Sequence, residues 1–130
     1  MLCRTKNYDA KFLEQHKKVN QVNYPGLVSS KSHDRGKQFL CGFGGMLSFI
    51  IEGGIKTADA FISKLDIPIS TASLGGVESL ITRPVQTSHS LLSDEELELA
   101  GIDKSLIRMS VGIESVNDII DDISQALDSI

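Results

Sequence analysis

Residues 107–111 alternate apolar and polar side chains, and one arginine lies between apolar neighbours in this segment. With a repeat of two residues, one face of the segment carries Ile107, Met109 and Val111. The opposite face carries Leu106, Arg108 and Ser110. The pattern predicts a strand whose apolar face is turned toward a core.

Arg108 is the sharpest candidate for chemistry in the chain. A guanidinium among apolar strand residues is costly to desolvate unless an anion meets it. The planar fork of arginine also matches a carboxylate with two hydrogen bonds. An ordinary strand arginine could instead pack its stem sideways and extend its head to water or to an acidic side chain. The residues alone leave both interpretations open.

Length and composition limit the possible classes of protein. The chain has 130 residues, which fit a single domain over residues 1–130, with 41% hydrophobic and 23% charged residues. The net charge of −4 argues against nucleic acid or an anionic membrane as a partner. No apolar run approaches the roughly 20 residues that span a bilayer. Two cysteines, Cys3 and Cys41, are too few for a disulfide framework, so we expect a cytoplasmic protein.

Helices and strands are expected to alternate along the chain, with turns at glycine and proline. The expected helices cover residues 9–16, 34–40, 55–65, 94–100 and 116–130. The expected strands cover residues 17–24, 46–51, 67–69, 77–81 and 106–111. This order predicts an α/β or α+β fold, a small sheet with helices mainly on one face.

The helix ends carry recognisable signals. Ser93 begins a capping box with Glu96, and Gly101 is a typical residue beyond a helix end. Ser115 is expected to cap the last helix, whose apolar residues form one stripe. The acids of residues 94–98 and 118–122 are expected to lie on solvent-exposed helix faces.

Other motifs give weaker signals. The glycine turns at residues 42–45 and 75–76 could bind phosphate, but neither matches a known phosphate-binding motif, so a backbone role is favoured. The three histidines, His16, His33 and His89, lack the spacing of metal ligands. A serine hydrolase built on Ser88 and His89 is disfavoured because the chain has no GxSxG elbow.

A set of longer motifs occurs in a fixed order from about Phe12 to the end. They are Tyr-Pro-Gly-Leu at 24–27, Gly-Phe-Gly-Gly-Met-Leu-Ser-Phe at 42–49, Ser-Leu-Gly-Gly-Val-Glu-Ser-Leu-Ile at 73–81, Thr-Ser-His at 87–89, Gly-Ile at 101–102 and Leu-Ile-Arg-Met-Ser-Val-Gly-Ile-Glu at 106–114. In order and spacing they closely resemble the C-terminal part of the Cys/Met-metabolism, or trans-sulfuration, family of pyridoxal-phosphate (PLP) enzymes. That family includes cystathionine γ-synthase, cystathionine γ- and β-lyases, and methionine γ-lyase.

The resemblance implies a fold and several roles. The fold would be that of the C-terminal domain of a fold-type I PLP-dependent transferase, packed on a larger cofactor domain. Arg108 would bind the α-carboxylate of a sulfur amino-acid substrate, and Ser73 would assist through the neighbouring backbone. The cofactor would be pyridoxal 5′-phosphate, an electron sink for proton removal from the substrate. Arg108 would orient that substrate without transferring protons, and the family's homotetramer is the implied assembly.

The sequence departs from the family in two respects. The Schiff-base lysine and the residues that hold the cofactor belong to the family's large domain and have no match here, so no catalytic or cofactor-binding residue is assigned. Ala72 stands before Ser73 where cystathionine γ-lyases commonly carry glutamate, which leaves lyase and synthase chemistry open.

Three hypotheses are consistent with this combination. The chain could be the substrate-binding C-terminal portion of a trans-sulfuration enzyme, inactive alone. It could be a non-catalytic binding or regulatory module that docks on full-length homologues. It could also be a truncated gene product without a selected role.

Overall fold

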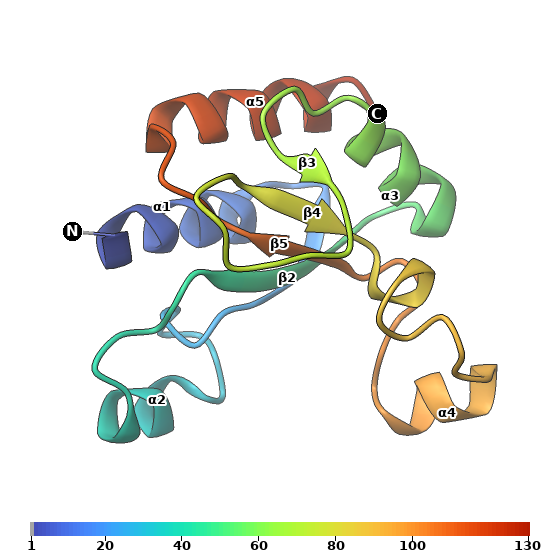
Figure 1. Cartoon of the computed structure of the whole chain (residues 1–130), viewed down its shortest axis with the longest axis horizontal. Helices are drawn as coiled ribbons and strands as arrows, with labels where there is room; N and C mark the ends of the chain where they lie inside the picture. The colour runs from blue at the N-terminus through green and yellow to red at the C-terminus, as the bar shows by residue number, and fades with distance from the viewer. Residues whose placement is uncertain (1) are drawn as a thin grey trace.

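Five strands form one sheet at the centre of the molecule (Figure 1). The computed structural model describes residues 2–130, and side chains from residue 7 onward. The strands are β1 (Val19–Asn23), β2 (Met46–Ile51), β3 (Ile69–Ser70), β4 (Leu80–Thr82) and β5 (Ile107–Ser110). Their order across the sheet is β1-β2-β5-β4-β3, and only the β3–β4 pair is parallel among these strands. The strand predicted around Arg108 is therefore the central one.

The helices are distributed unequally about the sheet. They are α1 (Leu2–Gln15), α2 (His33–Phe39), α3 (Gly54–Ser63), α4 (Asp94–Leu99) and α5 (Val116–Asp128), with a short 3₁₀ turn at Pro84–Gln86. Helices α1, α3 and α5 pack on one face of the sheet, whereas α2 and α4 lie on the other side, near opposite ends (Figure 1). This confirms the prediction of a mixed α/β fold with helices mainly on one face. None of the described helices is both long and apolar enough to cross a membrane.

Strand register produces the apolar layer under these helices. Phe49 of β2 lies opposite Ile107 of β5, and Met109 lies between Leu47 and Ile81. All five side chains are buried, at 2% exposure or less. Burial of each is worth about 1.5–3 kcal/mol. The covering side chains belong to the three helices of this face and include Leu13, Phe61, Ile119, Ile123 and Leu127.

The helix signals are confirmed at α4 and only in part at α5. The Ser93 hydroxyl accepts a hydrogen bond from the Glu96 N–H, and the Glu96 carboxylate accepts one from the Ser93 N–H. Gly101 adopts a φ of 68°, in the region that favours glycine. The apolar stripe of α5 is buried as expected, but the Ser115 side chain makes no capping hydrogen bond. The first-turn N–H groups of α5 are therefore not capped by this residue.

Three other predictions need correction. The predicted strand at residues 77–81 is only β4, residues 80–82, because the Gly112 N–H bonds to the Ser79 hydroxyl and interrupts the ladder there. Asp122 is buried and not solvent-exposed, because its carboxylate accepts hydrogen bonds from the Asp66 and Ile67 N–H groups. The first helix begins well before residue 9, at Leu2.

Candidate functional site

A row of polar side chains crosses the sheet on the face that α1, α3 and α5 leave uncovered. Asn23 of β1 is paired with Ser48 of β2, Ser48 with Arg108 of β5, and Arg108 with Thr82 of β4. The neighbouring rows in register, such as Phe49 with Ile107, point to the opposite face and are apolar. Alternation along four strands therefore places one cation, Arg108, on this face of the sheet, and Thr82 at the β4 end of the row is buried.

A shallow pocket of about 260 Å³ lies over this row. Its walls combine polar and apolar residues: Asn23, Met46, Leu47, Ser48, Pro84, Leu106 and Arg108. The Asn23 amide donates to the Ser48 hydroxyl at 3.1 Å, which fixes these two polar side chains beside the pocket. The pocket thus offers apolar walls and one positive charge, a combination suited to a small ligand with an anionic end.

The Arg108 guanidinium is held by backbone carbonyls. Its Nη2 donates to the Ala72 carbonyl at 3.0 Å and to the Ser73 carbonyl at 3.4 Å. The side chain is half-buried, and among the described residues no carboxylate forms an ion pair with it. The structure brings together the two residues that the sequence singled out, Arg108 and Ser73. Their binding of a substrate stays a prediction.

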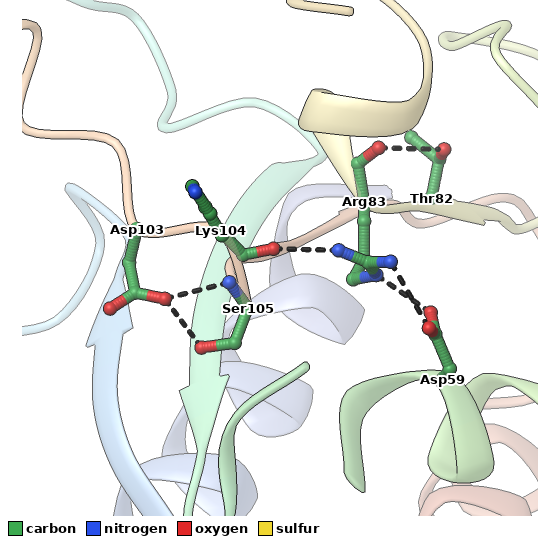
Figure 2. Close-up of polar contacts among 6 residues, drawn as sticks. All are labelled: Asp59, Thr82, Arg83, Asp103, Lys104 and Ser105. Atoms are coloured by element: carbon green, nitrogen blue, oxygen red, sulfur yellow. Dashed lines mark hydrogen bonds and ion pairs between the residues drawn. The ribbon is translucent and has the colours of Figure 1, made fainter. Parts of the chain in front are cut away.

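Arg83 is a second arginine of the fold, and its guanidinium is paired with a carboxylate (Figure 2). Its Nε and Nη2 donate to the two carboxylate oxygens of Asp59 on α3, at 2.6 and 3.1 Å. Its Nη1 donates to the Lys104 carbonyl at 2.7 Å, and the side chain is 6% exposed. Arg83 ties the end of β4 to α3 and to the segment before β5, so its charge is unavailable to a ligand. No local pattern predicts this pair, because the partners are 24 residues apart.

Asp103 organises the turn that leads into β5 (Figure 2). Its carboxylate accepts hydrogen bonds from the Ser105 N–H at 2.7 Å and the Ser105 hydroxyl at 2.5 Å. These bonds favour the ionised form and hold the pKa of Asp103 below its usual range. The turn places Leu106 and Arg108 at the start of the central strand.

Asp9 is a buried carboxyl that sequence reasoning missed. It lies on α1, is 0% exposed, and neither of its oxygens has a hydrogen-bond partner in the structure. Burial raises its pKa to about 7, and the charge of Glu114 contributes further. Asp9 is on the helix-covered side of the sheet, away from the pocket.

The weaker motifs acquire structural explanations. Gly44 and Gly75 have φ values of 73° and 76°, which supports the backbone role favoured for both glycine turns. His33 lies 2.9 Å from the Pro25 carbonyl, and His89 lies 2.8 Å from the Ser88 hydroxyl beside it in the chain. In the part of the chain that the structure describes, no three metal-ligating side chains come together.

Comparison with known proteins decides the family. The profile of the Cys/Met metabolism PLP-dependent enzymes matches residues 5–128, nearly the whole chain. The chain belongs to this family. A cystathionine γ-lyase of Dictyostelium discoideum is 46% identical over 90% of the chain, and cystathionine γ-synthase 1 of Arabidopsis thaliana is 43% identical over 93%. The trans-sulfuration resemblance is thereby confirmed.

A solved trans-sulfuration enzyme shares the fold. The crystal structure of cystathionine γ-synthase from Xanthomonas oryzae pv. oryzae in complex with cystathionine superposes with a TM-score of 0.89 at 38% identity. The match covers 97% of this chain and 34% of that one. The chain also spans only 30% of the Dictyostelium lyase and 22% of the Arabidopsis synthase. It therefore corresponds to a fragment of these PLP-dependent enzymes.

The described pocket does not fit the cofactor of the family. PLP needs a lysine amine for its aldehyde, and none of the residues that line the Arg108 pocket is a lysine. The pocket residues fit a carboxylate better, because their one charged group is a guanidinium. No step through the cofactor can be assigned to these residues.

Proposed function

We propose that this chain is the substrate-binding C-terminal portion of a PLP-dependent trans-sulfuration enzyme, and that Arg108 binds the α-carboxylate of a sulfur amino acid. The observation that carries the proposal is the position of Arg108. It lies on the uncovered face of the sheet, beside a pocket, and is oriented by two carbonyls and not neutralised by an acid. Arg83, only one residue beyond β4, shows the alternative, an arginine already occupied by Asp59.

The residues of the pocket would act by binding and orientation. Two carbonyls accept from Nη2 of Arg108, and the N–H groups of Nε and Nη1 would each be able to donate a single hydrogen bond to a carboxylate. Met46 and Leu106 would contact the apolar part of the substrate. Fixing the carboxylate restricts the position of Cα, and this raises the rate of a reaction there without proton transfer by Arg108.

The proposal includes inactivity of the isolated chain. The pocket provides no amine for the cofactor, and the relatives that it matches are about three times as long. Activity would require the remaining two-thirds of such an enzyme, and a homotetramer would be the assembled form. The mass of the assembled complex in solution tests that last point.

Reconstitution tests the proposal directly. The chain is mixed with the complementary two-thirds of a family member and PLP, and turnover of cystathionine is measured. Arg108→Ala should raise KM and lower kcat/KM by at least about tenfold, because a lost charged partner of a carboxylate costs 2 kcal/mol or more. The matched control is Arg35→Ala, which removes an exposed arginine on α2 and should leave both constants unchanged. Turnover by the isolated chain, or unchanged constants in Arg108→Ala, would contradict the proposal.

A docking module is the second candidate function. Several large apolar side chains are exposed on α2, in the β3–β4 loop, in the segment before α4 and on α4: Phe39 at 73%, Leu74 at 54%, Val77 at 63%, Leu91 at 97% and Leu99 at 89%. Such surfaces are typical of interfaces. A module of this kind would co-purify with a full-length homologue. Replacing Arg108 in the module would then leave the turnover of that homologue unchanged. A dependence of turnover on Arg108 would favour the enzyme portion instead.

A further inference from the structure

The loop between β3 and β4, residues 71–79, is fastened to the end of the central strand. The Gly75 N–H donates to the Ser110 hydroxyl at 2.8 Å, and the Val77 carbonyl accepts from the Ile113 N–H at 2.9 Å. Residues 72–78 are otherwise exposed to solvent. The shape of this loop therefore depends on a few anchoring bonds and not on burial.

Glu114 provides the strongest of these anchors, through Ser79. Its two carboxylate oxygens accept from the Ser79 N–H at 2.6 Å and from the Ser79 hydroxyl at 2.9 Å. The Ser79 oxygen in turn accepts from the Gly112 N–H at 3.0 Å, and Ser79 is 0% exposed. Hydrogen bonds to a carboxylate are stronger than neutral ones. Two bonds of this kind and the neutral bond from Gly112 all involve Ser79.

The loop and the strand touch so closely that only glycine fits at the crossing. A Cβ on Gly112 would lie 2.2 Å from the Val77 carbonyl oxygen and 2.6 Å from the Glu78 carbonyl carbon. Backbone atoms cannot yield at such distances, so the close contact between the loop and this segment requires glycine at position 112.

The other end of the same loop holds Arg108. The Ala72 and Ser73 carbonyls accept from Nη2 of the guanidinium. We propose that Glu114 is a positioning residue: by fixing Ser79 it sets the loop whose carbonyls aim Arg108 toward the pocket. Only the identity of the ligand that Arg108 binds rests on the proposed function. The orientation of Arg108 by the loop depends on residues of this chain alone.

Nuclear magnetic resonance of the arginine side chains tests the proposal on the full chain without cofactor or substrate. The readout is the hydrogen-exchange rate of the Arg108 Nη protons, with the Arg83 protons as an internal reference. Glu114→Ala should raise the Arg108 rate roughly tenfold, the loss expected for about one hydrogen bond, and should leave the Arg83 rate unchanged. Glu114→Gln, which keeps one acceptor for Ser79, should give an intermediate rate. Ser79→Ala removes the hydroxyl but keeps the N–H bond of residue 79 to Glu114, so it should also give an intermediate rate.

Glu78→Gln is the matched control, since Glu78 is an exposed acid of the same loop. An unchanged Arg108 rate in Glu114→Ala, with the Arg83 rate also unchanged, would overturn the proposal. Equal increases for both arginines would overturn it too, because they would mean general loosening of the fold. Failure of the proposed function would appear differently, as an Arg108→Ala enzyme with normal KM and normal kcat/KM.

Discussion

At the scale of single residues, the two arginines near β4 and β5 differ in what meets their charge. Asp59 and a carbonyl satisfy Arg83, so it contributes to structure. Carbonyl oxygens alone hold Arg108, and they orient a guanidinium without cancelling its charge. The sequence singled out Arg108 by its apolar strand neighbours, and the acid that pairs with Arg83 comes from α3, far away in the chain.

Asp9 makes a prediction about stability and pH. Its pKa is about 7 in the fold, above the ordinary value of 3.8, so the folded state binds a proton more tightly than the unfolded chain. This contribution to stability is fully present below about pH 4 and is lost as the pH rises to 7. Across that window one proton changes the free energy of unfolding by about 1.4 kcal/mol per pH unit. Asp9→Asn should remove this slope, measured by denaturant unfolding at a series of pH values.

The comparison with Asp9→Asn isolates this residue, because other carboxyls titrate in both proteins. Asp103, whose pKa is lowered, contributes the opposite slope in each. Glu114→Gln should lower the pKa of Asp9, because the negative charge of Glu114 raises that pKa. Parallel stability profiles for the native chain and Asp9→Asn would refute the assignment.

At the scale of elements, α5 is fastened by polar bonds as well as by its apolar stripe. Asp122 accepts from the Asp66 N–H at 3.1 Å and from the Ile67 N–H at 2.9 Å, which joins α5 to the segment after α3. Lys18 donates to the Leu127 and Ile130 carbonyls, both at 2.6 Å, at the C-terminal end of α5. A lysine at that end also interacts favourably with the helix dipole.

Asp122→Ala is expected to destabilise the fold by about 1–3 kcal/mol, because it leaves two part-buried backbone N–H groups without their acceptor. The measurement is the free energy of unfolding in urea. Asp121→Ala is the matched control, since Asp121 is an exposed acid on the same helix and should change stability by less than about 0.5 kcal/mol. Equal effects of the two substitutions would show that the Asp122 contacts add nothing.

Local patterns predicted the elements that depend on local physics. The bounds of β2, the α4 capping box and the α5 stripe follow from alternation, caps and spacing, and all are confirmed. The misses depend on distant partners. The local pattern predicts a strand at residues 77–79, but the Ser79 hydroxyl accepts a hydrogen bond from the distant Gly112 N–H. The pattern also predicts that Asp122 is exposed, but its carboxylate accepts from the Ile67 N–H in the segment after α3. Arg108 and Ser73 could be named from sequence, but the carbonyl contacts between them could not.

At the scale of the whole molecule, the sheet is covered on one face and carries its charged site on the other (Figure 1). Helices α2 and α4, which carry the exposed residues Phe39 and Leu99, lie on that second side. The chain spans less than a third of the Dictyostelium and Arabidopsis relatives. A one-sided sheet, exposed apolar groups and short coverage together support a unit that works against a larger partner.

The central claim is that Arg108 recognises a substrate carboxylate, and one binding measurement tests it most directly. The chain, assembled with the complementary two-thirds of a relative and PLP, is titrated with L-methionine and with its primary amide, which lacks the carboxylate charge. The native complex should bind methionine at least about tenfold more tightly than the amide, and Arg108→Ala should bind both equally. An undiminished preference for methionine in Arg108→Ala would contradict the claim.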